Sequence, residues 1–175
     1  RLHSTKNGIS KEPWLYGEKA ERIAEDLMRL RHRLLPYLYT ANVLTAREGA
    51  PICAPMYYGW DSPVAREIKN EYTFGSELIV APVTSKMRRD GLARTTVWLP
   101  EGTWTDFFTG ETFEGERLMT VKTPAERIPV YAKEGAIIPM LAEREGNSQA
   151  FDNLEVRVFR GDGSYTMYDE TGSIS

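Results

Sequence analysis

Carboxylates are the side chains of this sequence best suited to chemistry, because two of them facing each other in a pocket can act as acid and as base or nucleophile. The candidates stand in or beside segments with Gly, Ser or Pro that are typical of turns: Asp61, Asp106, Asp152, Asp162 and Asp169-Glu170. Aspartate is favoured in turns because its short side chain bonds to the local backbone. Turn formation therefore explains these positions, and no catalytic pair is predicted.

The histidines and the cysteine add little further chemistry. There are two histidines, His3 and His32, and one cysteine, Cys53. These are too few for a structural zinc site, and a lone cysteine forms no disulfide framework. No Ser/His/Asp set, glycine-rich phosphate loop or metal-ligand spacing stands out, so we expect no metal and no cofactor. His32 is interpreted as a structural helix residue, and His3, judged from its polar loop alone, as an exposed or structurally satisfied one.

Composition limits the class of protein and its partners. The chain has 175 residues, of which 41% are hydrophobic and 27% charged, as in ordinary soluble globular proteins with a core. A net charge of −3 provides no general attraction to nucleic acid or to an anionic membrane. No segment approaches the roughly 18 apolar residues that span a bilayer. The compartment stays open, with the cytoplasm favoured over secretion.

The elements that would position these residues begin with a long amphipathic helical pattern. Between residues 18 and 47, apolar side chains recur every three or four positions, and charged ones fall mostly between them. Pro36 interrupts this pattern and predicts a kink or break near Leu35, with Pro36 opening a second helix. Gly49 followed by Pro51 predicts where the second helix ends.

Past the helices the pattern changes to short strands separated by turns. The apolar run 77–81 predicts a buried strand, and the segments 95–99 and 104–108 predict the two arms of a hairpin. Trp98 and Trp104 stand at core-like positions within these arms. Regularly spaced short strands of this kind predict an antiparallel sandwich.

The last part of the chain resembles a separate unit. Residues 142–150 are polar and are interpreted as a linker. Beyond them the segments 154–159 and 164–168 predict a hairpin around the turn Gly161-Asp162-Gly163. One hairpin alone is marginally stable, so it is interpreted as the opening of a second, truncated β domain.

Several segments, taken in order, resemble glycoside hydrolase family 31, the α-glucosidase and α-xylosidase family. The most recognisable is RHRLLPYLYT at residues 31–40, which resembles the family's R-x-x-L-L-P-Y-L-Y-T helix. The others are Arg1-Leu2-His3-Ser4 with Lys11-Glu12-Pro13-Trp14, Gly49-Ala50-Pro51, residues 74–83, 99–106, 128–139 and 168–172. Each segment alone is a weak match, but their shared order covers nearly the whole chain.

The resemblance implies an α+β fragment that is mainly β. Residues 1–48 resemble the end of a (β/α)8 catalytic barrel with its closing helix, and residues 49–141 resemble the proximal C-terminal β-sandwich. Residues 150–175 resemble the start of a truncated distal β domain. The sequence begins with Arg1 and not Met, which agrees with an internal C-terminal fragment of a longer enzyme.

The resemblance also implies a retaining mechanism, with one aspartate as nucleophile and a second that protonates the leaving oxygen. In the family both aspartates lie on earlier barrel strands, so this segment carries no catalytic residue and is expected to be inactive alone. His3, in the family's R-x-H segment, is the substrate-contacting residue that carries over, and it would hydrogen-bond sugar hydroxyls. Trp14 is assigned to packing. The implied substrates are oligosaccharides with terminal α-linked glucose or xylose.

Other functions stay open at this point. The β portion could be a non-catalytic carbohydrate-binding module with a row of exposed aromatic side chains, or a structural sandwich that braces the barrel. The expected partners are the oligosaccharide substrate and the remainder of the catalytic barrel. Without that barrel, the helical segment 18–48 would expose an apolar stripe, which predicts self-association of the chain.

Overall fold

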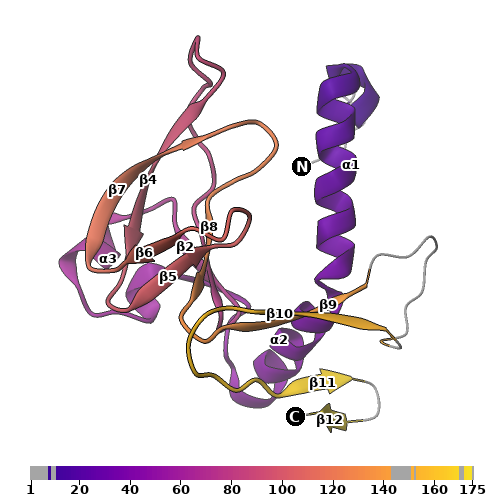
Figure 1. The fold of residues 1–175 in the computed structure, drawn as a ribbon, viewed down its shortest axis with the longest axis vertical. Coiled ribbons are helices and arrows are strands. Elements are labelled where there is room, and N and C mark those ends of the chain that lie inside the picture. The colour runs from indigo at the N-terminus through magenta and orange to yellow at the C-terminus, as the bar shows by residue number, and fades with distance from the viewer. Residues whose placement is uncertain (1–7, 9–10, 143–150, 152, 170–171, 175) are drawn as a thin grey trace.

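The computed structural model describes residues 8, 11–142, 151, 153–169 and 172–174. Figure 1 shows helix α1 standing apart from the strands along most of its length, with α2 at its foot beside β9, β10 and β11. The strands β4 to β8 form the other half of the molecule. In the described part of the chain, no helix is long and apolar enough to cross a bilayer.

The helices confirm the break predicted from Pro36. A short 3-10 helix, η1 (Pro13–Tyr16), precedes α1 (Glu18–Arg33) and α2 (Leu35–Glu48). Proline is tolerated in the first turn of α2 because the N–H that it lacks would have no partner there. Gly49 ends α2 in the left-handed region at φ 72°, and its N–H donates to the carbonyl of Thr45 at 3.0 Å.

The largest sheet has six antiparallel strands in the order β1-β2-β3-β8-β5-β6. Its central strand β3 is buried throughout, which confirms the buried strand predicted at 77–81. Between β1 and β2 lie η2 (Met56–Tyr58) and α3 (Pro63–Glu67). The strands of this sheet are β1 (Cys53–Pro55), β2 (Tyr72–Phe74), β3 (Leu78–Val80), β8 (Val130–Lys133), β5 (Thr103–Asp106) and β6 (Thr112–Glu114).

The hairpin predicted from segments 95–99 and 104–108 is wrong. Strand β4 (Ala93–Leu99) pairs with β7 (Arg117–Thr123), whereas β5 pairs with β6 and β8. The reason lies at Pro100, whose carbonyl accepts from the indole N–H of Trp104 at 2.9 Å and from the N–H of Glu116 at 3.2 Å. These bonds hold the connection between β4 and β5 in place. The chain there passes from the β4–β7 pair into the six-stranded sheet.

The hairpin predicted from segments 154–159 and 164–168 is also wrong. Strand β10 (Leu154–Val158) pairs with β9 (Ile137–Leu141), and β11 (Met167–Asp169) pairs with β12 (Gly172–Ile174). The glycines at 161 and 163 pass so close to Gly135 that a Cβ on either would collide with it. The turn therefore crosses over that backbone and does not fold 164–168 back onto β10.

Two clusters of buried side chains form the core. The first lies between the six-stranded sheet and the β4–β7 pair, and it includes Trp98 and Trp104, which are 8% and 5% exposed. Trp60 packs edge-on against both indoles, with ring centroids 6.1 and 6.3 Å away. The core positions predicted for these two tryptophans are confirmed. The second cluster joins α2 to β3, β8 and β9.

A buried carboxyl group lies at the edge of the first cluster. Glu71 is 3% exposed, and its Oε2 accepts a hydrogen bond from the N–H of Trp98 at 2.9 Å. The other oxygen, Oε1, has no hydrogen-bond partner among the described residues. Burial raises the pKa of Glu71 from 4.5 to about 7, because the charged form loses its hydration.

Glu71 should make the stability of the chain fall as pH rises. The unfolded carboxyl loses its proton near pH 4.5 and the folded one near 7, so unfolding releases a proton between these values. The stabilisation is complete below pH 4.5 and is lost as pH rises through 7. The loss amounts to about 3 kcal/mol, since one pKa unit is worth about 1.4 kcal/mol.

The substitution Glu71→Gln keeps an acceptor for Trp98 and cannot ionise. Urea unfolding at pH 4 and pH 8 should show a pH dependence smaller by about 3 kcal/mol than in the parent chain. Glu101→Gln, at an exposed turn position, is the matched control and should leave the pH dependence unchanged. An unchanged pH dependence in Glu71→Gln would show that folding does not raise the pKa of this carboxyl.

Candidate functional site

The predicted substrate residue His3 lies outside the described residues, so its sugar contact stays a prediction. The described segment that follows it is η1, which carries three exposed apolar residues: Trp14, Leu15 and Tyr16. Trp14 is 62% exposed, so this chain does not supply the packing predicted for it.

The acidic residues weighed as catalytic candidates are engaged in turns. Asp106 Oδ1 accepts from two backbone N–H groups of the next turn, at 2.8 and 2.9 Å. Asp169 Oδ1 accepts from the N–H three residues further on at 3.0 Å, and Asp61 is ion-paired with Arg66. The remaining candidates are Asp162, which is exposed, and Asp152 and Glu170, which lie outside the described residues.

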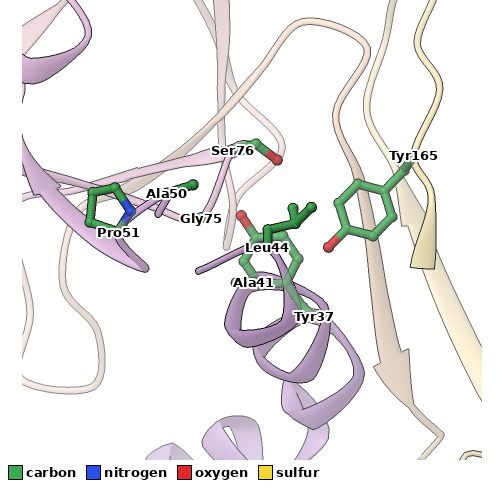
Figure 2. A pocket seen from close by; sticks show the side chains of 8 residues that line it. All are labelled: Tyr37, Ala41, Leu44, Ala50, Pro51, Gly75, Ser76 and Tyr165. Atoms are coloured by element: carbon green, nitrogen blue, oxygen red, sulfur yellow. The ribbon is translucent and has the colours of Figure 1, made fainter. Parts of the chain in front are cut away.

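One pocket opens between α2 and the turn that follows β2 (Figure 2). Its cavity volume is about 130 Å³, below the several hundred Å³ typical of small-molecule sites. Its polar groups are hydroxyls, and no charged side chain lines it. The lining residues are Tyr37, Ala41, Leu44, Ala50, Pro51, Gly75, Ser76 and Tyr165. Its size and lining do not fit a sugar-cleaving site.

In the ranges that the structure describes, no group of three or more His, Cys, Asp or Glu side chains is placed to hold a metal ion. His32 is half-buried on α1, and Cys53 is exposed on β1. Burial of part of its side chain raises the pKa of the Cys53 thiol, which lowers its thiolate fraction.

Exposed apolar side chains occur along η1 and α1. Helix α1 contains no buried residue, although its sequence is amphipathic. We call the exposed apolar residues of this region the open helix face: Trp14, Leu15, Tyr16, Leu27 and Met28. Near its start, α1 is tied to the rest of the chain by an ion pair of 2.8 Å between Lys19 and Glu126. Both groups are exposed, so this pair stabilises little.

Helix α2, in contrast, has one buried side. Its buried residues are Pro36, Tyr37, Thr40 and Ala41. The hydroxyl of Tyr37 donates to the carbonyl of Phe74 at 2.6 Å and accepts from the N–H of Glu77 at 3.1 Å. Sequence reasoning placed Tyr37 in the recognisable helix motif but assigned it no role. A tyrosine on the buried side of a helix needs a partner for its hydroxyl, and that requirement is the signal that could have singled it out.

Comparison with known proteins identifies the class. The model described as "Glycosyl hydrolase family 31 C-terminal domain" matches residues 49–138, and "Glycosyl hydrolases family 31 TIM-barrel domain" matches residues 1–41. These matches place the chain among the glycoside hydrolases. It belongs to glycoside hydrolase family 31, as its sequence motifs predicted.

Curated relatives include an alpha-xylosidase of Saccharolobus solfataricus, 32% identical over 98% of this chain and 23% of the relative. Alpha-glucosidase 2 of Bacillus thermoamyloliquefaciens is 28% identical over 92% of this chain and 20% of that protein. The chain thus spans about a fifth of the length of these relatives.

Solved structures share the fold. A Flavobacterium johnsoniae GH31 dextranase in complex with isomaltotriose superposes with a TM-score of 0.83 and 30% identity, covering 94% of this chain and 21% of that one. A cycloalternan-forming enzyme from Listeria monocytogenes, in complex with a pentasaccharide, gives 0.85 and 30% identity, covering 96% and 17%. The predicted α+β class, a few helices followed by antiparallel sheets, is confirmed.

The turn role of Asp106 leads to a direct test. Asp106→Ala should lower the free energy of unfolding by about 1–2 kcal/mol, because two N–H groups lose their acceptor. Asp106→Asn keeps a carbonyl oxygen in place and should cost much less. Urea unfolding of both variants measures the difference. If Asn and Ala cost the same, the charge of Asp106 matters and its role goes beyond the turn.

Proposed function

We propose that this chain is part of a retaining α-glycosidase that releases terminal α-linked glucose or xylose from oligosaccharides. The names of the relatives, alpha-glucosidase and alpha-xylosidase, support this activity. The oligosaccharides bound in the dextranase and in the cycloalternan-forming enzyme support a carbohydrate substrate. In such enzymes two carboxylates carry the reaction, and here we assign both to other parts of the enzyme.

The proposed role of this chain is to complete and brace the catalytic barrel. Residues 1–48 would form the end of the barrel, 49–141 the sandwich that supports it, and 150–175 the start of a further β domain. His3 would contact sugar hydroxyls at the C-terminal face of the barrel, where barrel enzymes place their substrate residues.

The observation that carries this proposal is the contrast between the two helices. One side of α2 is buried against the strands, whereas the adjoining α1 buries no residue and exposes Leu27 and Met28. Helix α1 lies within the segment 1–41 that matches the barrel domain, and helix α2 begins within it. The open helix face is therefore proposed to dock on the remainder of the barrel, which would cover these exposed apolar side chains.

A carbohydrate-binding module is the weaker alternative. It would need aromatic side chains in a row on an exposed sheet face, but Trp98 and Trp104 are buried in the core. Phe107 is buried as well, against Arg157, whose guanidinium carbon lies 4.7 Å from the ring centroid. Trp98, Trp104 and Phe107 are therefore part of the core and not an exposed sugar-binding row.

The first test is enzymatic. The chain alone should not turn over p-nitrophenyl α-glucoside or α-xyloside, whereas the complete enzyme should hydrolyse one of them. In the complete enzyme His3→Ala should lower kcat/KM by about tenfold or more, because hydrogen bonds to the sugar are lost. Lys11→Ala, in the same region, is the control and should change it little. Turnover by the chain alone would refute the assignment of the carboxylates elsewhere.

A second test examines the open helix face in the chain alone. Sedimentation at micromolar concentrations should show self-association, because two copies can cover each other's apolar side chains. Leu27→Glu should shift the chain towards monomer by placing a charge in that contact. Leu118→Glu, at an exposed leucine of β7, is the matched control and should leave association unchanged. A monomeric parent chain would show that this face needs no cover.

A further inference from the structure

Helix α2 is held by two separate parts of the chain, and only one of them belongs to the sandwich. On the sandwich side, Tyr37 reaches the turn between β2 and β3 through its bonds to Phe74 and Glu77. Gly75, in the same turn, has a φ of 61°, and a Cβ there would collide with the Tyr37 hydroxyl. Tyr37 is 1% exposed, and its hydroxyl leaves no space for a larger residue at position 75.

The second part is the segment near the end of the chain. Tyr165 stacks on the ring of Tyr37 with centroids 5.9 Å apart and an interplanar angle of 25°. The N–H of Tyr168 donates to the hydroxyl of Thr40 at 2.9 Å. The guanidinium of Arg47 lies over the Tyr168 ring, 4.7 Å from its centroid. Figure 2 shows Tyr165 beside Tyr37 at the pocket, on a segment of chain separate from α2.

The other end of this segment is fastened where α1 ends. Strand β10 pairs with β9 along its whole length. Arg33 donates to the carbonyl of Leu141 at 3.1 Å and forms an ion pair of 2.6 Å with Glu155. The side chain of Arg33 is 13% exposed, so this pair is better shielded from solvent than those at the surface. Further along, Phe159 packs against the second core cluster.

We propose that residues 153–169 act as a strap that holds α2 onto the sandwich, with the stacked pair Tyr37 and Tyr165 as its fastening point. The strap pairs with β9 and binds Arg33 through Glu155, and its Phe159 and Tyr165 pack on the second cluster. Its Tyr168 contacts α2 at Thr40 and Arg47. When the strap is loosened, α2 separates locally while the sandwich stays folded. This inference concerns the joint between helix and sandwich, and it holds whether or not the complete protein cleaves sugars.

Hydrogen exchange of the full 175-residue chain tests the strap, because it reports local opening segment by segment. Tyr165→Ala removes the stacking ring. It should lower the protection of amides in 35–48 and 153–169 by about tenfold or more, with β3 and β8 unchanged. Tyr58→Ala, at an exposed tyrosine of η2, is the matched control and should change neither.

A milder variant keeps the proposal testable if Tyr165→Ala fails to fold. Thr40→Val has nearly the same shape but removes the acceptor for Tyr168, so it should loosen residues 165–169 first and α2 to a smaller degree. Unchanged protection of α2 in the folded variants would overturn the strap. Equal loss in α2, β3 and β8 would also overturn it, because helix and sandwich would then open as one unit.

Discussion

The burial of the Tyr37 hydroxyl is the constraint on which the rest of the structure depends. A buried hydroxyl without partners costs about 1–3 kcal/mol, and here it is satisfied on one side by Phe74 and on the other by Glu77. Glu77 extends the connection, because its carbonyl accepts from the N–H of Lys133 at 3.1 Å and its carboxylate binds the Lys133 ammonium at 2.9 Å. The position of α2 is thereby linked through β3 to β8 at the centre of the sheet.

This constraint explains how one chain can hold two helices in such different states. The buried side of α2 is complete within the described residues, since the strands and the segment around Tyr165 both cover it. Helix α1 lies on the other side of the break at Leu34, and its apolar residues stay partly exposed. In its proposed role as a brace, the chain would have one complete joint at α2 and one surface at α1 that docks on another part of the enzyme. That is what a segment between a barrel and a sandwich in a family 31 glycoside hydrolase would require.

Local features of the fold could be predicted because they depend on neighbours along the chain. The break near Pro36 follows from the N–H that proline lacks, and the buried strand β3 follows from an uninterrupted apolar run. The choice of strand partners could not be predicted in this way. Alternation specifies which face of a strand is buried, but not which strand lies beside it. Both predicted hairpins failed at that step, at Pro100 and at the glycine turn near residue 161.

The sequence by itself determined the family, the two helices with their break, the burial of Trp98 and Trp104, and the turn roles of Asp106 and Asp169. These follow from local chemistry or from an ordered set of motifs. Only the tertiary structure decided that β10 pairs with β9, that Tyr165 stacks on Tyr37, and that Glu71 is buried with one oxygen that no described residue partners. Each of these depends on residues that are not neighbours along the chain, and such arrangements are selected by the packing of the whole core, which no local pattern records.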